Sequence, residues 1–190
     1  ALIPRPETEL LVETAMRWLR AYPGRRRVAD VGVGSGAIAV ALAVSVDDLQ
    51  VTATDISADA LAVAESNVRR HAVGQRVELV ETDLLAGVDG PFDLICANLP
   101  YVPSGRLPHL DVVKREPVLA LDGGADGLES IRRLLAQAPE QLAPGGLLLA
   151  EVDDSHETSR VAVAAEYCPE AAIGLRRDLA DKPRLLVVQT

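Results

Sequence analysis

The chain contains the stretch Arg27-Val28-Ala29-Asp30-Val31-Gly32-Val33-Gly34-Ser35-Gly36, which is followed by the apolar residues 37–43. The run that ends at Asp30 is typical of a buried parallel strand, and the apolar series after Gly36 favours a helix. Glycines at every second position permit positive φ angles and let a ligand approach the bare backbone. The stretch therefore predicts a strand, a tight turn and a helix that together form a nucleotide-type pocket.

A carboxylate that could complete this pocket is Asp55, which follows the next expected strand, residues 50–54. At this distance from the glycines a carboxylate can accept hydrogen bonds from both ribose hydroxyls of a nucleoside. Asp83 follows a third expected strand, residues 76–80, and could accept the adenine amino group while Leu84 packs on the ring; the alternative is a helix cap. The glycine pattern by itself also fits the dinucleotide fingerprint, so it does not name the cofactor.

A second motif, Asn98-Leu99-Pro100-Tyr101, follows the fourth expected strand, residues 92–97. Ligands of open parallel sheets bind at the carboxyl edge, so we expect this motif beside the glycines. The Asn98 side-chain oxygen and the Leu99 carbonyl can accept both hydrogens of a planar –NH2 group and so orient its nitrogen. Pro100 would stiffen the turn and Tyr101 would offer a flat contact, although the motif could also be an ordinary turn with a half-buried tyrosine. Together with the acidic Asp30 before the first glycine, the motif favours S-adenosylmethionine over a nicotinamide cofactor.

The rest of the chain continues an alternation of strands and helices, interrupted by the long segment 102–126, which we interpret as a loop that covers a substrate. The last two strands should pair as an antiparallel edge. The expected elements are a helix from about Glu7 to the Pro23-Gly24 pair, a helix from Ser57 to about His71, a helix at 128–142, a turn at 144–146, a strand at 147–152, a helix at 157–166, and strands at 171–175 and 183–188.

Composition narrows the class of protein. With 190 residues, of which 48% are hydrophobic, the chain can form one α/β domain with a substantial core. A net charge of −9 disfavours extensive electrostatic binding to the phosphate backbone of nucleic acid. Cys96 and Cys168, with no signal peptide and no apolar run long enough to span a membrane, indicate reduced thiols and a cytoplasmic location. The histidines and cysteines show no metal-ligand spacing, so we expect no metal.

These motifs resemble those of the class I S-adenosylmethionine-dependent methyltransferases and, within them, of the release-factor glutamine N5-methyltransferases. Residues 5–9 match the opening R-P-E-T-E of that family, and residues 30–39 match its D-x-G-x-G-S-G-A-I-A. Residues 55–61 match D-I-S-x-x-A-L, and residues 116–127 match E-P-x-x-A-L-x-G-G-x-D-G. The glycine motif is general, whereas the first and last blocks are specific to this family.

The resemblance implies a Rossmann-like three-layer sandwich whose seven-stranded sheet is mostly parallel, with an antiparallel C-terminal strand. Residues 1–190 would be a single catalytic domain without the family's N-terminal helical substrate-recognition domain. It would act as a monomer and methylate the glutamine in the Gly-Gly-Gln loop of peptide-chain release factors. The implied cofactor-binding residues are Asp30, Gly32, Val33, Gly34, Ser35, Gly36, Asp55, Ile56, Asp83, Leu84 and Asn98, the implied acceptor-binding residues are Pro6, Thr8, Glu116, Pro117, Asn98, Leu99, Pro100 and Tyr101, and the last four of these are the catalytic residues.

Two departures from the family pattern keep other acceptors open. Leu99 stands where the family has the first proline of Asn-Pro-Pro-Tyr, and Asn-Leu-Pro-Tyr resembles the motif of ribosomal RNA adenine dimethyltransferases. Residues 151–156 differ from the family's Glu-x-Gly sequence after the fifth strand. The alternatives are an exocyclic amine of an RNA or DNA base as the acceptor, a nicotinamide-dependent oxidoreductase, and a binding module without catalysis.

Overall fold

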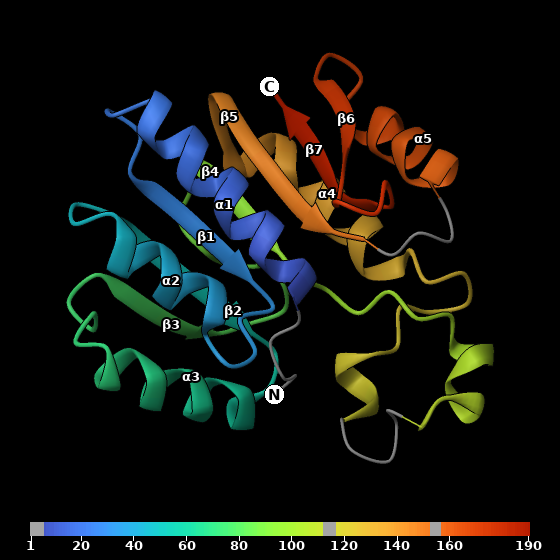
Figure 1. Cartoon of the computed structure of the whole chain (residues 1–190), viewed down its shortest axis with the longest axis horizontal. Helices are drawn as coiled ribbons and strands as arrows, with labels where there is room; N and C mark the ends of the chain where they lie inside the picture. Colours follow the sequence, from blue (N-terminus) through green and yellow to red (C-terminus); the bar gives the residue numbers. More distant parts are fainter. Residues whose placement is uncertain (1–5, 112–116, 153–156) are drawn as a thin grey trace.

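The computed structural model describes residues 6–111, 117–152 and 157–190, and it shows a twisted seven-stranded sheet between two layers of helices (Figure 1). The strand order is β3-β2-β1-β4-β5-β7-β6, in which β7 is antiparallel to both of its neighbours and the other pairs are parallel. The expected three-layer fold is therefore confirmed. The strands are β1 (Arg27–Val31), β2 (Gln50–Asp55), β3 (Val77–Glu81), β4 (Phe92–Ala97), β5 (Leu142–Glu151), β6 (Ala172–Arg177) and β7 (Pro183–Gln189).

Two separate apolar cores lie on the two faces of the sheet. Helices α1 (Pro6–Ala21), α2 (Ala37–Ser45) and α3 (Ala58–Arg70) cover one face, and α4 (Glu129–Gln141) and α5 (Glu157–Tyr167) cover the other. The strands serve both cores because successive side chains point to opposite faces. On β4, for example, Leu94 and Cys96 pack under the first layer, whereas Ile95 and Ala97 pack under the second.

The two central strands bring the sequence motifs together. In the parallel pair of β1 and β4, Asp30 lies opposite Cys96 and Val31 lies opposite Ala97. The residues that follow each strand, the glycines after β1 and Asn98 after β4, consequently emerge side by side at the carboxyl edge. This placement confirms the position expected from the sequence.

The start of β5 differs from the sequence-based expectation. We expected a turn at 144–146 before a strand that began at Leu147, but β5 begins at Leu142 and runs through this segment. Phe92 pairs with Leu142 and Leu94 pairs with Leu147, so residues 143–146 bulge opposite Asp93 alone. The Pro-Gly-Gly sequence does bend the backbone, but pairing with β4 on both sides of the bulge keeps it within one strand.

The long segment after β4 lies beyond the carboxyl ends of the strands (Figure 1). Its described residues include the short 3-10 helices η1 (Ser104–His109) and η3 (Val118–Ala120). In the described part of the chain, none of the helices combines the length and the apolar character needed to cross a membrane.

Candidate active site

The glycine loop between β1 and α2 presents its backbone to a cavity. Gly32, Gly34 and Gly36 have φ angles of +74°, +55° and +82°, which favour glycine. The N–H groups of Gly32 and Val33 both donate to the carbonyl of Thr54, at 2.8 Å, and so hold the loop against the end of β2. The nearest atom that a Cβ on Gly34 would meet lies 3.9 Å away. A ligand can therefore approach this part of the loop at close range.

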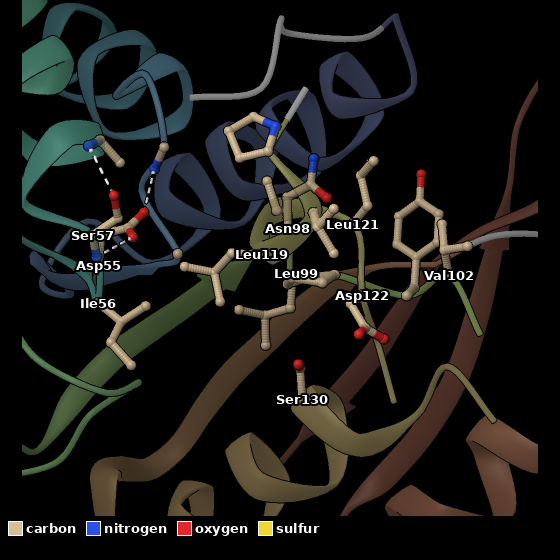
Figure 2. Close-up of a pocket in the computed structure, with 18 of the residues that line it drawn as sticks. Asp55, Ile56, Ser57, Asn98, Leu99, Val102, Leu119, Leu121, Asp122 and Ser130 are labelled. Carbon is tan, nitrogen blue, oxygen red and sulfur yellow. Dashed lines mark hydrogen bonds between the residues drawn. The ribbon is translucent and has the colours of Figure 1, made fainter. Parts of the chain in front are cut away.

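Asp55 is fixed at the rim of the cavity by two backbone hydrogen bonds. Its carboxylate oxygens accept from the N–H of Gly34 and from the N–H of Ser57, each at 2.9 Å (Figure 2). Carboxylate oxygens have further lone pairs, which remain able to accept hydrogen bonds from a diol. Ile56 beside it is 55% exposed and offers an apolar surface for a flat ring.

Asp30 is fully buried at the end of β1, beneath the glycine loop. One carboxylate oxygen accepts from the N–H of Ala39 at 2.9 Å, and the other has no hydrogen-bond partner among the described residues. Burial raises the pKa of this carboxyl from its ordinary value of 3.8 to about 7; the nearby Asp55 charge adds to this, and the Ala39 hydrogen bond opposes it.

Asp83 and Leu84 are the residues that the sequence predicts to contact adenine. They line the same cavity, and Leu84 has a φ of +55°. One oxygen of Asp83 pairs with Arg133 of α4, a partner that the sequence did not reveal because it is 50 residues away. Both side chains are about half exposed, so the ion pair contributes little to stability. The role of Asp83 toward adenine stays a prediction.

Asn98 and Leu99 lie directly against the glycine loop. A Cβ on Gly32 would come within 2.9 Å of Leu99 Cδ2, so the Leu99 side chain would have to move, and within 3.7 Å of the Asn98 carbonyl oxygen, an ordinary van der Waals contact. The φ of +74° independently favours glycine at this position. Asn98 is half-buried, and its Nδ2 donates to Thr8 Oγ1 at 3.2 Å. Thr8 in turn donates to Glu151 Oε2 at 2.7 Å. The resemblance implied that Thr8 binds the acceptor; Thr8 does line the cavity, its hydroxyl contacts these two protein side chains, and its role toward the acceptor stays a prediction.

The last block of the family pattern holds the segment that follows the motif. The N–H of Val102 donates to the carbonyl of Leu121 at 2.9 Å, and the N–H of Gly123 donates back to the carbonyl of Val102 at 2.8 Å. Gly127 packs so closely on Tyr101 that a Cβ would overlap the Tyr101 carbonyl oxygen. The glycines of this block therefore position Tyr101, a role that the sequence pattern alone did not indicate.

A single cavity of about 850 Å³ is lined by the glycine loop, Asp55, Asp83 and the Asn98 motif. Figure 2 shows Asp55 and Ser57 at one side, Asn98 and Leu99 in the middle, and Leu121 and Asp122 beyond them. Of the residues expected in the site, Asp30 and Gly36 do not line the cavity, whereas Pro117 does. Glu116 and the side chain of Pro6 lie outside the described residues. The expected residues that line it are Thr8, Gly32, Val33, Gly34, Ser35, Asp55, Ile56, Asp83, Leu84, Asn98, Leu99, Pro100, Tyr101 and Pro117.

The sheet order, the glycine loop and the carboxylate after β2 define a Rossmann-like domain of the class I methyltransferase type. A crystal structure of a ribosomal protein L11 methylase from Lactobacillus delbrueckii subsp. bulgaricus superimposes with a TM-score of 0.70 at 26% identity, over 98% of this chain and 80% of that one. The model of the methyltransferase small domain family matches residues 6–116. The chain belongs to this family.

Curated relatives share much of the sequence. A protein named release factor glutamine methyltransferase from Deinococcus radiodurans is 46% identical over 154 residues, which are 80% of this chain and 54% of the relative. A protein of the same name from Gloeobacter violaceus is 40% identical over 189 residues, 98% of this chain and 66% of the relative. The chain thus spans between about half and two thirds of the length of these relatives.

Proposed function

We propose that this chain is the catalytic domain of an S-adenosylmethionine-dependent protein methyltransferase that modifies the N5 amide nitrogen of glutamine. Its acceptor is the glutamine in the Gly-Gly-Gln loop of peptide-chain release factors. The names of the relatives and the specific blocks at residues 5–9 and 116–127 support this choice over other acceptors. We further propose that the enzyme works as a monomer in the cytoplasm, where its acceptor acts.

The observation that carries the proposal is the contact between the Asn98 motif and the glycine loop. A Cβ on Gly32 would lie 2.9 Å from Leu99 Cδ2 and 3.7 Å from the Asn98 carbonyl oxygen, so the motif and the loop are in direct contact. A polar group that can hold an –NH2 group is thereby placed next to the backbone that would hold the methyl donor. The motif has the groups needed to hold an –NH2 group, and it lies where the methyl donor would bind. An ordinary Asn-x-Pro-Tyr turn would have no reason to lie beside the glycine loop.

The cavity fits S-adenosylmethionine. Gly34 leaves its backbone accessible, Asp55 can accept from the ribose hydroxyls, and Ile56 offers an apolar face to adenine. When bound, S-adenosylmethionine supplies a methyl group on a positively charged sulfur.

The residues of the chain make a weak nucleophile reactive by orientation. The lone pair of an amide nitrogen is delocalised, so an unrestrained glutamine side chain attacks poorly. Asn98 Oδ1 and the Leu99 carbonyl accept its two N–H hydrogens and fix the nitrogen in place, which can supply several powers of ten in rate. After transfer the alkylated nitrogen is strongly acidic and loses its extra proton to water.

An exocyclic amine of a nucleic-acid base is the second candidate acceptor, and Leu99 favours it. The Asn-Leu-Pro-Tyr sequence resembles the motif of RNA adenine dimethyltransferases. However, the chain carries a net charge of −9 and only 3% aromatic residues, which give it little with which to bind phosphates or stack bases.

The test is a methyl-transfer assay with labelled S-adenosylmethionine and three acceptors: release factor, release factor with its loop glutamine replaced, and total RNA. We expect label in the first acceptor alone. The variant Asn98→Ala should transfer methyl groups roughly 100-fold more slowly, with the Kd for S-adenosylhomocysteine changed much less. Label in RNA alone, or normal turnover of Asn98→Ala on release factor, would overturn the proposal.

A further inference from the structure

Three polar side chains from distant parts of the sequence meet behind the Asn98 motif. Thr8 lies in the first turn of α1, Asn98 follows β4, and Glu151 ends β5, so that 90 and 143 residues separate Thr8 from its two partners. Thr8 is 7% exposed and Glu151 is 6% exposed. The bonds run from Asn98 Nδ2 to Thr8 Oγ1 at 3.2 Å and from Thr8 Oγ1 to Glu151 Oε2 at 2.7 Å.

The direction of these bonds follows from the chemistry of the groups. The Thr8 hydroxyl donates to Glu151 Oε2, which uses the single proton that a hydroxyl carries. Thr8 Oγ1 then has only lone pairs to offer to Asn98. The Asn98 side chain must therefore turn its –NH2 group toward Thr8, because the reverse orientation would place two acceptor oxygens against each other.

We propose that Thr8 and Glu151 are positioning residues that hold the Asn98 amide with Oδ1 directed to the acceptor. Because the Asn98 –NH2 group is bound behind the motif, Oδ1 is the end left for the ligand. A flipped amide would present a donor to the N–H groups of the acceptor and repel them. This inference rests on the proposed function, since it assigns to Asn98 the role of accepting an N–H of glutamine.

The proposal gives Thr8 a role different from direct binding. Although Thr8 borders the cavity, its hydroxyl acts through Asn98. Glu151 acts on Asn98 only through Thr8, and it does not border the cavity. Both residues should therefore affect turnover more than cofactor affinity.

The decisive variant is Thr8→Val, which keeps the shape of the side chain and removes the hydroxyl. We expect kcat for methyl transfer to fall roughly tenfold or more, with the Kd for S-adenosylhomocysteine within about threefold of wild type. Thr8→Ser restores the hydroxyl and should recover most of kcat. Glu151→Gln should give an intermediate loss, because an amide can donate to Thr8 and release the hydroxyl proton toward Asn98.

Thr14→Val is the matched control. Thr14 is a second buried threonine of α1, and its hydroxyl has no hydrogen-bond partner among the described residues. The same change at this position should leave kcat and cofactor affinity unaltered. An equal loss of kcat in both valine variants would show a general effect of disturbing α1 and would overturn the proposal, as would normal kcat in Thr8→Val.

A second readout separates this inference from the identity of the acceptor. In 15N NMR spectra the side-chain –NH2 signals of Asn98, assigned by their loss in Asn98→Ala, should exchange slowly with water in wild type and in Thr8→Ser and faster in Thr8→Val. If wild type methylates no release factor but shows this pattern, the acceptor assignment fails and the positioning role stands. If the –NH2 signals are the same in all three proteins, the positioning role fails.

Discussion

At the scale of single residues, the site depends on carboxylates that the backbone already holds. Asp55 accepts hydrogen bonds from the N–H groups of Gly34 and Ser57, so it fixes the loop, and it also lines the cavity. We predict that Asp55→Ala weakens binding of S-adenosylhomocysteine by about 1 to 3 kcal/mol, the scale for a lost charged acceptor. Isothermal calorimetry measures the change in affinity. Asp55→Asn, which retains one acceptor oxygen, should lose less affinity than Asp55→Ala. Unchanged affinity in Asp55→Ala would mean that this carboxylate does not bind the ribose.

Asp30 illustrates a different effect, a buried carboxyl that makes stability depend on pH. Its folded-state pKa of about 7 lies above its ordinary value of 3.8, so the native state binds the proton more tightly than the unfolded chain. Preferential protonation of Asp30 in the native state therefore adds to the free energy of unfolding at low pH, and this contribution is lost as the pH rises toward 7. Between about pH 5 and 8 the loss should be about 2 to 3 kcal/mol, at about 1.4 kcal/mol per pKa unit.

This pH dependence is measured by urea unfolding of wild type and Asp30→Asn at both pH values. The difference between the two proteins cancels the groups that they share, including the Cys96 thiol on the neighbouring strand, whose pKa burial raises so that it stays neutral. We expect wild type to lose more stability than the variant as the pH rises. The same change in both proteins would show that Asp30 ionises normally in the native state.

At the scale of elements, the glycine-rich block before α4 supports Tyr101. Gly127 has a φ of +76°, and a Cβ there would overlap the Tyr101 carbonyl oxygen. Gly127→Ala should cost about 1 to 2 kcal/mol of stability from the left-handed backbone and should also lower turnover, because Tyr101 must move. Gly87→Ala is the control, since Gly87 has a φ of +70° but open space around its Cβ position. In urea it should show only the loss due to the left-handed backbone, less than Gly127→Ala, and it should keep normal turnover.

The elements also show what sequence patterns can and cannot predict. The apolar runs and glycines placed β1, α2 and β4 correctly, because local periodicity and backbone freedom determine these elements. The helix expected from Ser57 also forms: Ser57 caps α3, and its hydroxyl accepts from the N–H of Ala60. The bulge in β5 was read as a turn, because only pairing with β4 reveals that the strand continues. Contacts such as Thr8 with Glu151 depend on the packing of the whole fold and left no local signal.

At the scale of the whole molecule, the family resemblance rather than periodicity predicted a seven-stranded, mostly parallel sheet. The strand order is known only from the structure, and it determines where charges lie. Arg25 and Arg26 precede β1 and Arg27 begins it, at the end of the strand opposite the cavity. Arg25 pairs with Asp93 at 3.3 Å, Arg26 pairs with Asp48 at 2.5 Å, and Arg27 donates to the carbonyl of Asp89 at 2.7 Å. These arginines therefore bind other parts of the chain at the edge of the sheet opposite the cavity. They are too far from the active site to hold a phosphate backbone there.

This charge distribution, with a net charge of −9, predicts how the reaction responds to salt. An enzyme that makes six to ten phosphate contacts loses roughly 10³- to 10⁵-fold in affinity between about 50 and 200 mM salt, because binding releases condensed counterions. A protein acceptor requires no such release, so kcat/KM for release factor should change by less than about tenfold over the same range. The salt dependence of the Kd for S-adenosylhomocysteine, measured in parallel, corrects for any effect on the cofactor. A steep fall in kcat/KM that cofactor binding does not explain would mean that the acceptor carries phosphates, and the nucleic-acid alternative suggested by Leu99 would then replace glutamine.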